Sequence, residues 1–216
     1  MIDESRRRDV YNAAFIFMIA NDLATIPICP EELCRKQGIE IVSLTQIISH
    51  TGLTQDDIFS IWGNKDGVLQ RFNGSYKIAY NDTMPLVRIR FTLLEELSHR
   101  LLNHCSNQDF NMFNQKYDQH TYGVYEEEAR MCAGLILCPP QFYYNSPSEL
   151  TLNSFQQVYK VSETCARARI DILRKYESEI KKCEFYDLLP KINYVNQAKV
   201  SSCDFAIYQG GEYAVI

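Results

Sequence analysis

The sequence predicts an α+β fold in which a small twisted sheet packs against one long helix, with helical parts at both ends of the chain. Alternating apolar residues flank Asn73-Gly74, the dipeptide that favours a tight hairpin turn. Apolar residues at helical spacing extend from about Leu86 to Asn103. Similar helical spacing recurs before residue 25 and after residue 147. Strands grouped between helical segments are typical of an α+β domain.

The first part of the chain has clear stop signals. Pro30 and Gly38 bracket a short helix, because proline suits a first turn and glycine suits a C-terminal cap. Thr54 with Asp57 predicts an N-cap. The predicted elements are helices over about 3–24, 31–36, 45–50 and 54–59, with a strand over 39–42.

The second part carries the hairpin and the remaining helices. Pro139-Pro140 ends one of these helices, and Ser162 predicts the N-cap of another. The elements are strands over 67–72 and 75–80, helices over about 86–103, 125–137, 148–159 and 162–177, a polar connection over 106–122 and a strand-like stretch over 205–208. We predict one domain over residues 1–145 and a C-terminal helical, helix-turn-helix-like region with a mixed tail over 146–216.

Composition excludes several classes of function. The net charge of −5 provides no electrostatic footprint for nucleic acid, so we expect no direct nucleic-acid partner. The most apolar early run, residues 13–20, is far shorter than the roughly 20 residues of a membrane span. The eight cysteines include no Cys-x-x-Cys pair, which favours reduced thiols. We therefore expect a cytoplasmic protein without a membrane partner.

The candidate site is the segment Glu95-Glu96-Leu97-Ser98-His99. In His-Glu-x-x-His zinc peptidases, the two histidines lie one helical turn apart and bind the metal, and the glutamate is the general base. Here Glu96 holds the position of the base, His99 that of the second ligand, and Glu95 that of the first histidine. Zinc accepts carboxylate oxygen, so Glu95 remains a candidate ligand.

A third ligand is expected from the acidic segment of the next helix. Glu126 shares a helix face with Ala129 and Ala133, whose small side chains let two helices approach closely. Glu128 is the next candidate. His104, five residues after His99, is predicted to lie on another side of the helix and not to bind the metal.

Two carboxylates and one imidazole form a harder, more negative donor set than two imidazoles and one carboxylate. Such a set weakens the pull of the ion on bound water and shifts preference from Zn²⁺ toward Mn²⁺ or Fe²⁺. Loss of the metal is the alternative. In that case Glu95, Glu96 and Glu126 would crowd like charges, and at least one carboxyl pKa should be raised.

The chain resembles the ImmA/IrrE metallopeptidases over about residues 10–175. The resemblance rests on Arg88-Ile89-Arg90-Phe91-Thr92-Leu93, Glu95 to His99, Glu126-Glu127-Glu128-Ala129 and Leu135-Ile136-Leu137-Cys138-Pro139. It implies a zincin-like core, Glu96 as general base, and His99 and Glu126 as metal ligands. Glu95 stands where the family has its first histidine ligand, and it stays a candidate ligand because zinc accepts carboxylate oxygen. It also implies a cytoplasmic enzyme of a mobile-element or stress-response system that regulates transcription by cutting a helix-turn-helix repressor.

Three further hypotheses follow. The outer strand of the hairpin, taken as residues 76–80, would hold substrate by strand addition. A rival to the peptidase is a pseudo-protease that has lost its metal and acts as a regulatory protein-binding module. Another rival places DNA binding on the helices over 148–177, whose basic residues are Arg167, Arg169, Arg174 and Lys175. The sequence predicts no oligomeric state.

Overall fold

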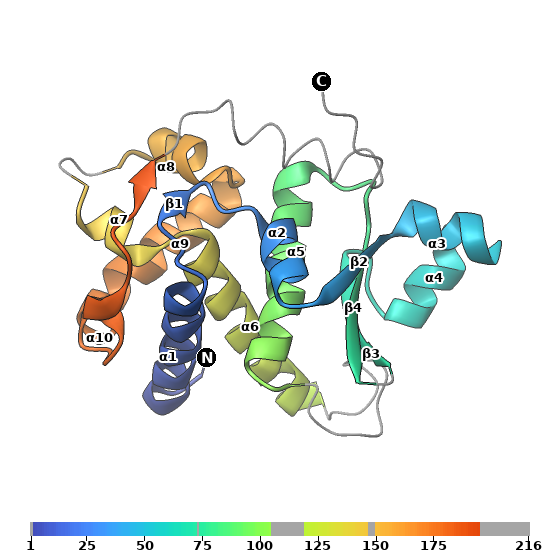
Figure 1. Cartoon of the computed structure of the whole chain (residues 1–216), viewed down its shortest axis with the longest axis horizontal. Helices are drawn as coiled ribbons and strands as arrows, with labels where there is room; N and C mark the ends of the chain where they lie inside the picture. The colour runs from blue at the N-terminus through green and yellow to red at the C-terminus, as the bar shows by residue number, and fades with distance from the viewer. Residues whose placement is uncertain (1, 73, 105–118, 147–149, 195–216) are drawn as a thin grey trace.

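The computed structural model describes residues 2–72, 74–104, 119–146 and 150–194. Its sheet has three strands in the order β2-β4-β3. Strand β2 (Ile39–Ser43) pairs in parallel with β4 (Ser75–Tyr80), and β4 pairs antiparallel with β3 (Gly67–Phe72). The sheet therefore has one central strand, β4, with β3 as an outer strand (Figure 1).

The two faces of the sheet contact different helices. Leu69 and Ile78 belong to the main core, which they share with α5 (Leu86–Leu101). Val68 and Ala79, one residue along each strand, pack in a smaller core with Trp62. That smaller core lies under α3 (Leu44–Thr51) and α4 (Gln55–Trp62). This alternation is what the period-2 pattern of the hairpin requires when both faces are covered.

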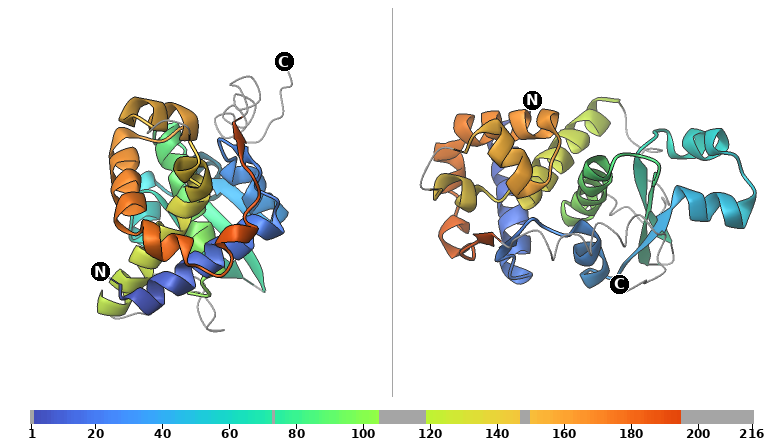
Figure 2. Two further views of the ribbon diagram at one scale, coloured as in Figure 1. Left: turned by 90° about the vertical axis from the view of Figure 1, so that its left-hand side faces the viewer. Right: turned by 90° about the horizontal axis from the view of Figure 1, so that it is seen from above.

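The other helices form a body on the far side of α5 from the sheet (Figures 1 and 2). They are α1 (Glu4–Ala20), α6 (Gln119–Leu137), α7 (Pro140–Tyr144), α8 (Leu152–Tyr159), α9 (Glu163–Lys175) and α10 (Glu177–Lys181). Helix α2 (Pro30–Lys36) packs on α5 and β2, a 3₁₀ turn spans Tyr186–Leu188, and β1 (Thr25–Ile26) pairs in parallel with β5 (Asn193–Tyr194). The predicted α+β fold is confirmed.

Local signals confirm most element boundaries. Thr54 and Asp57 form the predicted capping box of α4, and the Ser162 side chain accepts a hydrogen bond from the Cys165 amide at the start of α9. Gly38 has φ +68°, the left-handed conformation in which glycine is least strained, just after α2. The predicted strand over 205–208 lies outside the described residues.

Two predictions were wrong. The strand over 76–80 is the central strand, because β2 pairs with its other side, so the outer strand of the hairpin is β3. Helix α6 begins at Gln119, inside the segment predicted as a polar connection. The pairing of β4 with β2 and the packing of α1 against α6 join segments that are far apart in the sequence. Local sequence patterns therefore do not predict them.

The main core includes side chains from before and after residue 145, such as Leu93 and Phe155. The predicted division of the chain at this residue stays a prediction. Among the described residues, none of the helices combines the length and the apolar character that crossing a bilayer requires.

Candidate active site

Helices α5 and α6 pack side by side and carry all four predicted site residues. Ala129 and Ala133 on α6 are fully buried, as expected for small residues at a close helix contact. On α5, Glu95 and His99 lie one turn apart and are both buried. The contact between the two helices therefore brings polar groups into a largely buried interface.

Three predicted ligands converge at this interface. Glu126 Oε1 lies 3.3 Å from His99 Nε2. The Arg130 guanidinium bridges the two carboxylates, with its Nε 2.9 Å from Glu95 Oε1 and its Nη2 2.7 Å from Glu126 Oε2. Glu95, His99 and Glu126 thus form one connected cluster with Arg130, a residue for which sequence reasoning gave no role.

A chain of polar contacts orients the His99 ring. His99 Nδ1 lies 3.0 Å from His104 Nδ1, and His104 Nε2 lies 3.0 Å from Glu128 Oε2. Arg6 Nε donates to Glu128 Oε1 at 2.6 Å. Burial raises the pKa of Glu128, but hydrogen bonds from His104 and Arg6 outweigh it and lower that pKa overall. Burial lowers the pKa of His104, which favours its neutral form.

These states fix the direction of the hydrogen bonds. An ionised Glu128 accepts the Nε2–H of His104, so the Nδ1 of a neutral His104 must accept from His99 Nδ1–H. The other ring nitrogen of His99, Nε2, faces Glu126 and the shared site. Metal-binding histidines are commonly oriented in this way, through the ring nitrogen that does not bind the metal. Burial raises the pKa of Glu126, but the hydrogen bond from His99 helps to lower that pKa overall.

His104 reaches His99 because α5 ends between them. Asn103 adopts the left-handed conformation with φ +57°, and the His104 amide donates to the His99 carbonyl at 2.9 Å. The chain therefore folds back, and the His104 ring stacks on Tyr125 with centroids 4.2 Å apart. The expectation that His104 lies on a different side of a continuing helix was wrong, and its contact with the site is made through His99.

Glu96 lies between the helix and the sheet. Its Oε2 accepts a hydrogen bond from the Leu69 amide of β3 at 2.7 Å. Burial, with the charges of Glu95 and Glu126 adding to it, raises the pKa of Glu96 to about 7. A carboxyl group with such a pKa is suited to take up and release protons near neutrality. The raised carboxyl pKa expected for crowded like charges is thus found at Glu96.

Tyr122 is a further neighbour that sequence reasoning missed. It hydrogen-bonds to Glu126, and burial raises the pKa of its hydroxyl. It lies one turn before Glu126 on α6, so the i, i+4 spacing is the signal by which it could have been found. The same spacing links Glu126 with Arg130.

Within the described part of the chain, no three His, Cys, Asp or Glu side chains stand at the spacing of a metal site. Glu95 and Glu126 each direct one oxygen toward Arg130 instead. The donor set nevertheless suits a divalent cation. Two carboxylates and an oriented imidazole converge, and a positively charged group already bridges the carboxylates.

Other acidic and basic residues have separate partners. Glu127 accepts a hydrogen bond from the Ile2 amide at 3.2 Å. Its side chain therefore faces the residues just before α1 and not His99. On α9, Arg169 is buried and Arg167 pairs with Glu163. Arg174 donates to the Tyr143 hydroxyl and Lys175 lies over the Tyr176 ring, so all four cations considered for DNA binding have partners within the protein.

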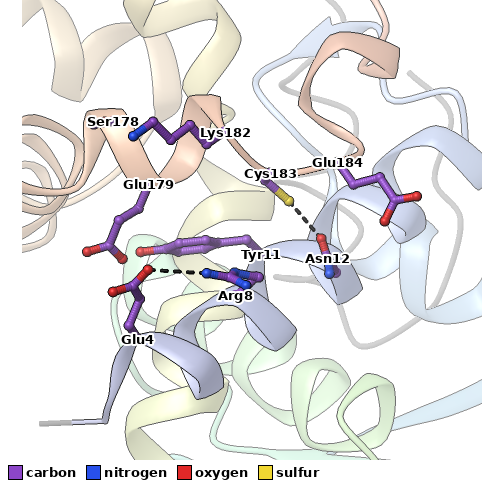
Figure 3. Close-up of a pocket in the computed structure, with 9 residues that line it drawn as sticks. All are labelled: Glu4, Arg8, Tyr11, Asn12, Ser178, Glu179, Lys182, Cys183 and Glu184. Atoms are coloured by element: carbon purple, nitrogen blue, oxygen red, sulfur yellow. Dashed lines mark hydrogen bonds and ion pairs between the residues drawn. The ribbon is translucent and has the colours of Figure 1, made fainter.

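A separate cavity of about 280 Å³ lies between α1 and α10. Figure 3 shows the residues that line it. Its walls carry an i, i+4 ion pair between Arg8 and Glu4, and Cys183 Sγ lies 2.7 Å from Asn12 Oδ1. These groups come from other elements than those that carry Glu96. The α5–α6–β3 site remains the stronger candidate, because it joins carboxylates and an imidazole in one buried cluster.

Residues 34–171 match the family model of the IrrE N-terminal-like domain, Peptidase_M78. The match extends from α2 into α9 and includes Glu95, Glu96, His99 and Glu126. A search of curated proteins finds no match.

Proposed function

The chain belongs to the IrrE N-terminal-like domain family, whose function is of the metallopeptidase type, and we propose that it is an endopeptidase that cleaves a protein substrate. One observation carries the proposal. Glu96, a carboxyl group with a pKa of about 7, lies against the outer strand β3 and beside the cluster of Glu95, His99 and Glu126.

In this proposal Glu95, His99 and Glu126 would hold a zinc ion, or Mn²⁺ or Fe²⁺ given the harder donor set. When bound, such an ion supplies Lewis acidity toward a peptide carbonyl and a water molecule. Glu96 takes a proton from the attacking water and passes it to the leaving amine. His104 and Glu128 would hold the His99 ring so that its Nε2 stays directed at the site.

We further propose that substrate binds in extended form along β3. The Leu69 amide donates to Glu96, so it points away from β4 and toward the open side of the strand. Arg71, two residues along, has the same orientation. A peptide added to this edge would pass directly beside Glu96.

Strand addition predicts a pattern of amide protection. Binding of an extended peptide to chelator-treated protein should slow hydrogen exchange at Arg71, whose amide faces the open edge. The amides of Val68 and Gln70 face β4 and serve as internal controls, because they are already protected. Exchange measured by NMR with unchanged rates at Arg71 under saturating peptide would contradict binding along β3.

The resemblance to repressor-cleaving enzymes motivates the proposed substrate, a helix-turn-helix repressor in the cytoplasm. The test is incubation of the protein with purified helix-turn-helix repressors and with unfolded casein, in Zn²⁺, Mn²⁺ or Fe²⁺, followed by mass spectrometry of the products. Internal cleavage that is lost in chelator is expected. Intact substrates under all three metals would contradict the endopeptidase.

A second function, a pseudo-protease acting as a regulatory protein-binding module, is favoured by one specific observation. Arg130 already satisfies one oxygen of Glu95 and one of Glu126 without a metal. A binding module would bind a repressor with the same affinity in the presence and in the absence of chelator. It would release no fragments of the repressor. Calorimetric binding with and without chelator separates the two functions.

A further inference from the structure

Arg130 is placed to act as a cation for the site. It projects from α6 and contacts one carboxylate on its own helix and one on α5. Its side chain is 58% exposed, whereas those of Glu95 and Glu126 are only 11% and 14% exposed. The charged head thus lies at the mouth of the site, and the carboxylates lie inside.

The guanidinium and a divalent ion would share the same two carboxylates. Arg130 uses Glu95 Oε1 and Glu126 Oε2, one from each predicted carboxylate ligand. The other oxygen of Glu126 faces His99 Nε2 at 3.3 Å. An ion held by all three residues would share both carboxylates with Arg130, and its charge would repel the guanidinium.

We propose that Arg130 is a built-in cation that competes with divalent metal for Glu95 and Glu126, so that metal binds only when this side chain turns out to solvent. The inference rests on the proposed function only in taking Glu95, His99 and Glu126 as the ligands. The partial exposure of Arg130 makes such an exit feasible, because its head can be hydrated without disturbing the core.

The same geometry explains what Arg130 does when metal is absent. Without it, two nearly buried carboxylates from adjacent helices would face each other with no guanidinium between them. Arg130 should therefore stabilise the metal-free protein and weaken metal binding. These opposite effects separate competition from a purely structural ion pair, which would alter stability alone.

The test is calorimetric titration of chelator-treated full-length protein with Zn²⁺ and with Mn²⁺. Arg130→Gln should bind at least one of the two ions about tenfold more tightly than wild type. The matched control is Arg167→Gln, which removes another i, i+4 partner of a glutamate from a side chain that is 63% exposed. Its metal affinity should stay within about twofold of wild type.

Thermal unfolding in chelator provides the second measurement. Arg130→Gln should lower the midpoint relative to Arg167→Gln, and adding Glu95→Gln to Arg130→Gln should restore part of the loss. Equal or weaker metal binding by Arg130→Gln, including no binding by either protein, would overturn the proposal. Neither measurement depends on peptide hydrolysis. A tenfold gain in metal affinity would therefore support competition by Arg130 even if the protein hydrolyses no peptide. If the protein hydrolyses peptides but Arg130→Gln shows no gain in metal affinity, competition is refuted and the peptidase function is not.

Discussion

Replacing Glu96 with glutamine is expected to abolish peptide hydrolysis and, in the same protein, to increase stability at neutral pH. Removal of a general base lowers the rate of such reactions by roughly 10²–10⁴-fold. Glutamine keeps the shape of the side chain and an oxygen that can accept from the Leu69 amide at its present position. Loss of kcat with little change in KM, measured on a cleaved repressor or on casein, is the expected signature.

The gain in stability follows from the raised pKa. Glu96 has a folded-state pKa of about 7 against an ordinary value of 4.5. Below about pH 4.5 the carboxyl is protonated in both states and costs nothing. As pH rises from 4.5 through 7, the unfolded chain releases the proton more readily than the folded protein, so wild type loses stability. The loss is complete above pH 7 and is on the order of 2–3 kcal/mol.

Denaturant unfolding in chelator at pH 4.5 and pH 8 measures this difference. Glu96→Gln should match wild type at pH 4.5 and exceed it at pH 8. Glu163→Gln, at an exposed ion pair on α9, should change stability by less than about 1 kcal/mol at either pH. An equal gain in stability at both pH values would show that burial does not raise the pKa of Glu96. Retained peptide hydrolysis by Glu96→Gln would exclude Glu96 as the general base.

The parts of the fold that were predicted correctly are those with local causes. The dipeptide Asn73-Gly74 predicted a hairpin at this point of the chain, and β3 and β4 have the predicted bounds. Helical spacing places Glu95 and His99 on one face of α5 without any knowledge of the rest of the fold. The outer position of β3 was missed, because it follows from the pairing of β4 with β2. Strand β2 lies more than thirty residues before β4 in the chain.

The candidate site divides in the same way. Ala129 and Ala133 correctly predicted the close approach that brings Glu126 to His99. Arg130 was missed although its pairing with Glu126 is a local i, i+4 contact, because an arginine side chain is neither a metal ligand nor a general base. Its bond to Glu95 depends on how the two helices pack, which the sequence does not state.

His104 illustrates a different limit. A helical wheel extended past residue 101 places it away from His99, and that extension is wrong by only a few residues. The left-handed residue that reverses the chain is Asn103, a residue type that tolerates this conformation. An asparagine near the expected end of a helix was therefore the available signal. Its consequence, a histidine that orients the candidate ligand, appears only in three dimensions.

Gly134→Ala is expected to destabilise the protein by about 2–4 kcal/mol, although alanine in a helix is normally better than glycine by about 1 kcal/mol. A Cβ at Gly134 would lie 1.8 Å from Nη1 of Arg169 and 2.4 Å from its Cζ. Arg169 is only 6% exposed, so its guanidinium has no solvent into which it can move easily. The steric and desolvation costs of displacing a buried charge exceed the gain in helix propensity.

Gly123→Ala on the same helix is the matched control, because a Cβ there would meet nothing within 4 Å and the position is exposed. It should leave stability unchanged or raise it by up to about 1 kcal/mol. Thermal unfolding should therefore move the two variants in opposite directions, with Gly134→Ala lower by about 5–10 °C than wild type. Equal midpoints would mean that Arg169 repacks freely, and the contact between α6 and α9 would then be looser than the burial of this arginine implies.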